Sequence, residues 1–208
     1  MKSENRKIIA SDKSFTKLLR KEIHRLGPNA NLNHIDTSKI TKMTRIFYGD
    51  DEFDGDISEW DTSSVVDMSY AFGLSVFNGD ISNWNTANVI HMDGTFANSK
   101  FKGDISQWNT KNVLYMNGLF CNAEFNGDIS QWDFSNVVDA NGMFEQNLKR
   151  SSFSNIDISR WQQNKQIVYD GWFLKMVEQS HQFKNEYEAS ILKSTITQAL
   201  KIDKSISL

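Results

Sequence analysis

Four copies of one phrase recur along the chain at a fixed interval of 24 residues. The copies are FDGDISEW at 53–60, FNGDISNW at 77–84, FKGDISQW at 101–108 and FNGDISQW at 125–132. Further apolar positions keep the same register, so the full unit is F-x-G-D-I-S-x-W-[DN]-[TF]-x-x-V-x-x-[MA]-x-x-x-F. This period indicates stacked repeats, because one coil of this length cannot bury its own apolar side.

Weaker copies flank the four clear ones, over 32–47 upstream and over 157–173 downstream. We therefore expect about six coils, with the Trp, Met and Phe positions forming one continuous core. Residues 57–62 match the L-x-x-L-x-L pattern, in which a short strand enters each coil. Residues 65–72 place apolar side chains at i, i+3 and i+7, which predicts a short helix or 3₁₀ turn on the return leg.

The unit has two polar positions of structural interest. Gly55 and its counterparts recur where each coil must turn back, a role that suits a positive φ. Asp56 and its counterparts are predicted to accept backbone N–H groups in Asx turns. Asn88 and its counterparts, or a neighbouring Thr or Ser, are candidates to cap the return-leg helix.

The repeat unit and the leading segment Gly27 to Ser38 resemble BspA-like leucine-rich repeats, a bacterial family with repeats of 23–26 residues. The resemblance covers about 27–173 and implies a solenoid without catalytic residues. Members of that family include surface proteins and lipoproteins that bind host matrix or other cells.

The predicted fold class is an α/β repeat, a leucine-rich-repeat-type solenoid with an N-terminal capping helix and C-terminal helices. Residues 1–31 form the cap and the following turn, 32–173 the solenoid, and 174–208 a C-terminal helical cap or a tail that dimerises or grips a partner. The N-terminal helix is expected over 12–26, with Phe15, Leu18, Leu19, Ile23 and Leu26 on its apolar face. Ser11 or Asp12 is the predicted cap at its start.

Charge is distributed unevenly along a chain whose net charge is only −3. Residues 1–50 hold 11 Lys and Arg against 5 Asp and Glu, whereas residues 51–150 hold 5 against 15. An acidic middle segment favours a basic protein partner over direct contact with nucleic acid.

The sequence offers little chemistry for catalysis or metal binding. Residues 50–61 mimic an EF-hand loop, but the next copy of the repeat lacks most of the ligands, so the repeat explains the acids better. The four histidines are scattered, Cys121 is the only cysteine, and no nucleophile or phosphate-binding motif occurs. We expect no enzyme activity, no cofactor and no metal.

Two outward-facing positions of each predicted strand are the best candidates for partner binding, on what we expect to be the concave face. The residues are Glu59, Asp61, Asn83, Asn85, Gln107, Asn109, Gln131 and Asp133. They favour non-enzymatic protein–protein recognition through a polar, partly acidic face.

Two alternatives stay open at this point. One is a cytoplasmic inhibitor from a phage or mobile element that blocks a host nucleic-acid-binding or defence protein. The other is a fragment of a surface adhesin or lipoprotein. Because no signal peptide or membrane-spanning segment is visible, a cytoplasmic location is expected.

Overall fold

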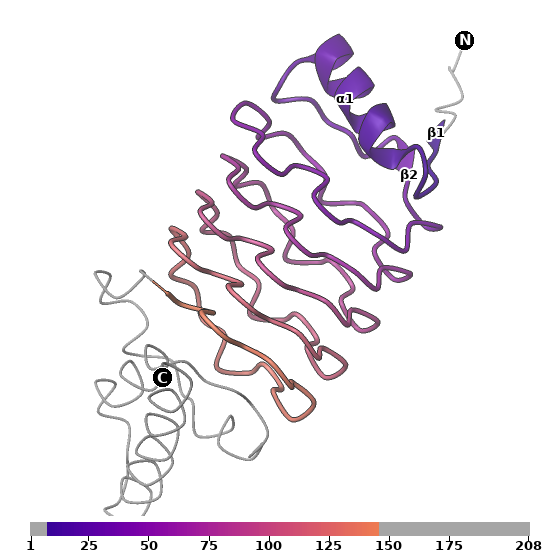
Figure 1. Cartoon of the computed structure of the whole chain (residues 1–208). Coiled ribbons are helices and arrows are strands. Elements are labelled where there is room, and N and C mark those ends of the chain that lie inside the picture. Colours follow the sequence, from indigo (N-terminus) through magenta and orange to yellow (C-terminus); the bar gives the residue numbers. More distant parts are fainter. Residues whose placement is uncertain (1–7, 146–208) are drawn as a thin grey trace, which may run out of the picture.

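The computed structural model describes residues 8–145 (Figure 1). It begins with strand β1 (Ile8–Ile9), helix α1 (Phe15–Leu26) and strand β2 (Ile35–Asp36). β1 and β2 pair in parallel, and beyond them the chain winds into coils that stack on one another. The predicted coil over 157–173 and the predicted C-terminal helices lie outside the described residues.

Parallel bridges join successive coils at one column of the repeat, and a further parallel bridge pairs Asn31 with Asp56. Isolated parallel bridges connect, in order, Lys42, Asp67, His91, Tyr115 and Asp139. The strand predicted over 57–62 is therefore wrong, because that leg consists of turns in which Trp60 N–H donates to the Ile57 carbonyl at 3.2 Å. The repeated bridges lie on the next leg of each coil, at Val66 and Asp67 and their counterparts, which we call the bridge leg.

The return leg contains no helix within the described coils, so the helix predicted over 65–72 is also wrong. Alternate N–H groups bond across to the next coil, as from Phe72 to the Thr95 carbonyl at 2.9 Å. The N–H groups between them close local turns, as from Ala71 to the Met68 carbonyl at 3.0 Å. Tyr70 has a φ of 57°, which a right-handed helix does not allow. Spacings of three and four residues are thus produced by successive turns rather than by a helix.

Stacked aromatic rings fill the space between the legs. Trp60 and Trp84 are 6.0 Å apart between ring centroids, and their planes differ by 13°. Each of the four ladder tryptophans also donates its Nε1–H to a carbonyl of the coil before it, as Trp108 does to Ile81 at 3.1 Å. Two Phe columns stack in the same way, so the core is continuous along the described coils.

The column of threonines faces the core, as the phenylalanine at its fourth position suggests. Thr62 and Phe134 are both 2% exposed. The Thr62 hydroxyl donates to the Asn85 carbonyl of the next coil at 3.1 Å, which satisfies its buried polar group. Thr110 makes the same bond to Asp133 at 3.0 Å.

The glycine that precedes each Asp is needed for space rather than for its backbone angle. A Cβ at Gly79 would lie 2.8 Å from Phe77 Cζ, and one at Gly103 would lie 2.7 Å from Phe101 Cζ. Neither glycine has a positive φ, so the prediction that this column uses left-handed geometry is wrong. The adjacent Phe ring folds over the glycine, and a side chain there would displace it.

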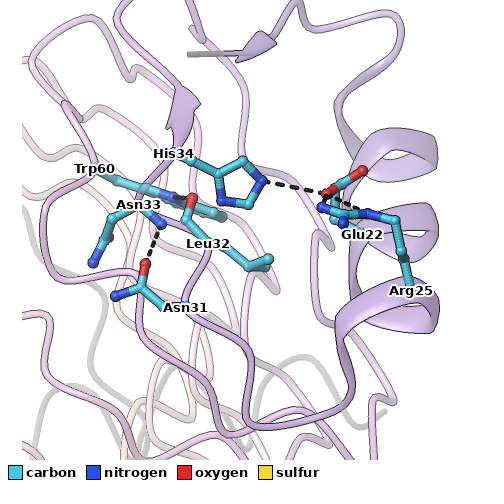
Figure 2. A network of polar contacts seen from close by, with 7 residues as sticks. All are labelled: Glu22, Arg25, Asn31, Leu32, Asn33, His34 and Trp60. Carbon is cyan, nitrogen blue, oxygen red and sulfur yellow. Dashed lines mark hydrogen bonds and ion pairs between the residues drawn. The ribbon is translucent and has the colours of Figure 1, made fainter. Parts of the chain in front are cut away.

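Helix α1 covers the first coil, with Phe15 and Leu19 buried. Leu26, expected on the apolar face, is 43% exposed, while Glu22 is buried instead. Figure 2 shows the Glu22 carboxylate accepting from Arg25 on the same helix and from His34 Nε2, at 3.3 Å, on the first coil. This polar link joins the cap to the coils, because a buried carboxylate needs donors.

The predicted helix cap is also corrected. The helix begins after Ser14, whose side chain makes no capping bond. Asp12 instead accepts the backbone N–H groups of Thr41 at 2.9 Å and Lys42 at 3.3 Å. Its carboxylate therefore fixes the segment before the helix to the first coil.

Candidate functional site

All eight predicted partner-binding residues are exposed. They lie on the leg of turns rather than on a strand, two positions apart within each coil, and so form two rows along the stack. The first row is Glu59, Asn83, Gln107 and Gln131. The second row is Asp61, Asn85, Asn109 and Asp133. Since the expected strand is absent, their assignment to a concave sheet face does not follow, but their grouping on one leg does.

The second row has a structural task. One side-chain oxygen of each residue accepts the backbone N–H two positions on, at 3.0 Å from Asp61 to Ser63 and 3.1 Å from Asn85 to Ala87. Asn109 and Asp133 repeat this Asx turn at 3.1 and 2.8 Å. These side chains are therefore fixed in direction by their own backbone.

The first row projects without such restraint. Within residues 8–145, the Glu59 and Asn83 side chains have no hydrogen bond. The Gln107 and Gln131 amides donate to the preceding serine hydroxyls, at 3.3 and 3.2 Å. Glu59 is the only charged member of this row, so like charges do not face each other across adjacent coils.

A third row of carboxylates lies on the same leg, and it forms the predicted Asx turns. The carboxylates of Asp56, Asp80, Asp104 and Asp128 accept the N–H of the serine two positions on, at 2.8 to 3.0 Å. The bond from the Ser58 backbone lowers the pKa of Asp56, and that from the Ser106 backbone lowers the pKa of Asp104. Both groups therefore carry negative charge at neutral pH.

Several acids of the EF-hand-like stretch over 50–61 accept hydrogen bonds from the chain itself. Asp50 accepts from the Phe53 backbone at 2.8 Å, Asp54 from Asn78 at 2.7 Å, and Asp56 from the Asn31 amide at 2.7 Å. No group of three or more His, Cys, Asp and Glu side chains within residues 8–145 is arranged to hold a metal ion. The Asp50, Asp54 and Asp56 carboxylates therefore take part in hydrogen bonds within and between coils.

The asparagine column has a structural role other than the predicted helix cap. Asn88, Asn112 and Asn136 donate their amide groups to carbonyls of the preceding coil, each at 2.7 Å. They form a polar ladder along the exposed edge beside the bridge leg, which adds to the connection between coils.

The bridge leg carries surface residues that the sequence analysis did not single out. Val66, Ile90 and Leu114 are half-buried there, and Val138 is 38% exposed. Beside this aliphatic row, the His91 and Tyr115 rings stack at 5.0 Å between centroids. The signal was present as apolar doublets at the 24-residue period, such as Val65-Val66, because β-branched pairs favour extended backbone.

A second cluster was also missed, on the return legs of the first coils. The Arg45 guanidinium carbon lies 5.1 Å from the ring centroids of both Tyr48 and Tyr70. The sequence signal for this cluster was a departure from the repeat, since Arg45 and Tyr70 occupy positions at which later coils have glycine.

Comparison with known families gives two overlapping matches to one family model. The model is described as "Mycoplasma protein of unknown function, DUF285", and it matches residues 20–100 and 74–190. Searches of curated proteins and of solved structures found no match. No helix within residues 8–145 has the length and apolar character needed to cross a membrane.

Proposed function

The chain belongs to the DUF285 family of mycoplasma-type proteins of unknown function, and we propose that it is a non-enzymatic protein-recognition module. The observation that carries the proposal is the pair of exposed polar rows on one leg of the stack. We further assign the stack to the leucine-rich-repeat type of solenoid. The 24-residue period, the parallel bridges and the resemblance of the repeat to BspA-like proteins support that assignment.

A rigid backbone supports recognition by these rows. Hydrogen bonds join neighbouring coils on the bridge leg, as from Ile90 to Val66 at 2.9 Å, and on the return leg, as from Phe96 to Leu119 at 2.9 Å. The side chains of the two polar rows, on the leg of turns, are thereby held at a regular spacing. Such pre-organisation reduces the entropy lost when a partner binds.

The chemistry of the rows favours a polar or basic partner surface. The first row offers one carboxylate and three amides, and amides both donate and accept hydrogen bonds. The neighbouring Asp56 row adds negative charge, and residues 51–150 hold 15 acids against 5 bases. A basic partner would associate faster at low salt than at high salt.

The experiment uses the full chain as immobilised bait in a lysate of the source organism, with captured proteins identified by mass spectrometry. A variant with Glu59, Asn83, Gln107 and Gln131 changed to Ser tests the first row without altering the Asx turns. A control variant with Glu52 and Asn126 changed to Ser alters exposed polar residues outside the rows.

A true partner is expected to bind the control variant as it binds the unchanged chain. Its affinity for the row variant should fall at least about tenfold, as is typical when several central contacts are removed. Equal binding to the row variant and the control would refute this surface as the recognition site.

A further inference from the structure

Three bulky residues with left-handed backbone gather on the return legs of the first two coils. Arg45, Tyr70 and Leu74 have φ values of 56°, 57° and 56°. Later coils fill the equivalent positions with residues that tolerate this geometry, namely Gly94, Gly118, Gly142, Asn98 and Asn122. Within the described coils, large side chains at these strained positions are thus confined to one area.

The Arg45 and Tyr70 side chains form an organised cluster with Tyr48. The Arg45 guanidinium lies over both the Tyr48 and Tyr70 rings at 5.1 Å, and the two rings meet edge to face at 6.0 Å. The neighbouring coils leave room for these rings. A Cβ at Gly94 would lie 2.6 Å from Tyr70 Cδ1, and one at Gly73 would lie 3.1 Å from Tyr48 Cδ2.

The cluster faces solvent. Tyr48 is 42% exposed, Leu74 is 49% exposed, and Arg45 is exposed. Among residues 8–145, no carboxylate forms an ion pair with Arg45. Asp50, the next acid along the sequence, accepts the backbone N–H groups of Glu52 and Phe53 instead. The guanidinium is therefore oriented by two rings, and no carboxylate of the described residues pairs with it.

We propose that Arg45, Tyr48, Tyr70 and Leu74 form a second docking surface, which binds a protein segment presenting a carboxylate next to an apolar side chain. A planar guanidinium matches a carboxylate through two parallel hydrogen bonds, and its orientation here reduces the freedom lost on binding. Tyr48 supplies apolar area beside it, and exposed Leu74 extends this area because it follows Gly73, whose position lies against the Tyr48 ring. Tyr and Arg are, together with Trp, enriched where the binding energy of protein interfaces concentrates.

A nucleic acid fits this surface less well. Binding to a phosphate backbone depends on several cations, whereas this cluster offers one. The exposed apolar side chain of Leu74 would gain little from contact with a charged phosphate backbone. The occupant is therefore a protein segment, and an oligonucleotide serves as a test arm.

None of these four residues belongs to the polar rows, so this docking surface is separate from the one formed by the rows. The test uses the full chain and short Gly/Ser peptides that carry one Glu and one Leu at several separations. Matched peptides have Gln in place of Glu, and oligothymidylate is the nucleic-acid probe. Binding is measured by fluorescence anisotropy.

The key variant is Arg45→Gly, which places at this position the glycine that later coils have at the equivalent positions, Gly94 and Gly118. It relieves backbone strain, so its melting temperature should equal or exceed that of the unchanged chain. Its affinity for the Glu peptides should fall at least about tenfold, because a charge-assisted double hydrogen bond is lost. Arg45→Lys should also bind more weakly, since it keeps the charge but lacks the planar fork. The variant of the Glu59 row should bind the peptides normally, which separates this proposal from the first.

Several results would overturn the proposal. Failure of the unchanged chain to bind any Glu peptide would do so, as would equal binding of Glu and Gln peptides. A lower melting temperature for Arg45→Gly would show that the side chain serves the fold. Unchanged peptide binding by Arg45→Gly, or preference for oligothymidylate over every peptide, would also contradict it.

Discussion

Two glycines of one column allow the cost of backbone geometry to be separated from the cost of a steric clash. Gly94 and Gly118 occupy equivalent return-leg positions, with φ values of 57° and 58°. A Cβ at Gly118 would meet nothing nearer than Cys121 Cβ at 3.6 Å, whereas a Cβ at Gly94 would overlap the ring of Tyr70. Changing each glycine to alanine should therefore have unequal effects on stability.

The magnitudes follow from the two contributions. Left-handed backbone costs an alanine about 1–2 kcal/mol, and the reduced entropy of the unfolded chain returns about 0.4–1 kcal/mol. Gly118→Ala should therefore reduce the free energy of unfolding by about 1 kcal/mol. Gly94→Ala carries the same cost plus about 1–3 kcal/mol for displacing the Tyr70 ring.

The assay is urea unfolding of the full chain, followed in parallel by tryptophan fluorescence and far-ultraviolet circular dichroism. Adding Tyr70→Gly to Gly94→Ala should remove the excess cost, because the ring that clashes is gone. The same addition to Gly118→Ala should leave the Gly118→Ala penalty unchanged. Equal losses for the two single alanine variants would refute the proposed ring contact over Gly94.

Two further predictions concern the core and the N-terminal cap. Trp108→Phe removes the Nε1–H bond to the buried Ile81 carbonyl, so the free energy of unfolding should fall by about 1–3 kcal/mol in urea titrations; a loss below about 0.5 kcal/mol would contradict this role. Hydrogen bonds from Arg25, and then from His34, hold the pKa of Glu22 below its ordinary value of 4.5. Because the folded-state pKa is depressed, this contribution is complete above pH 4.5 and is lost as the pH falls below it. Melting temperatures measured across that range should decline less steeply for Glu22→Gln than for the unchanged chain; parallel curves would argue against the link.

The repeat itself determined much of what the structure shows. Its period follows from the registered Phe and Trp positions, and these side chains do stack from coil to coil. The replacement of threonine by Phe134 identified an inward-facing column, and both residue types are buried. The Asp of the Gly-Asp pair was predicted to close an Asx turn because its carboxylate can reach the backbone two residues on, which is a local property.

The conformations of the legs were decided only by the tertiary structure. Apolar side chains at i, i+3 and i+7 occur both in a helix and in successive turns, so residues 65–72 alone do not distinguish them. The choice depends on hydrogen bonds to the neighbouring coils, which keep alternate N–H groups of the return leg out of a helix. The strand was misplaced for a related reason, since a parallel bridge requires a partner one coil away.

For the candidate surfaces too, the sequence revealed some features and the tertiary structure alone revealed others. The sequence alone identified the rows of Glu59 and Asp61 as exposed, because polar residues at core-flanking positions of a repeat must face solvent. It did not bring Arg45, Tyr48 and Tyr70 together, since Tyr70 belongs to the next coil. The buried position of Glu22 likewise required the packing of α1 on the first coil, where His34 and Arg25 supply its donors. Local preferences along the chain determined the repeat and its turns, whereas contacts between residues distant in sequence decided which side chains meet.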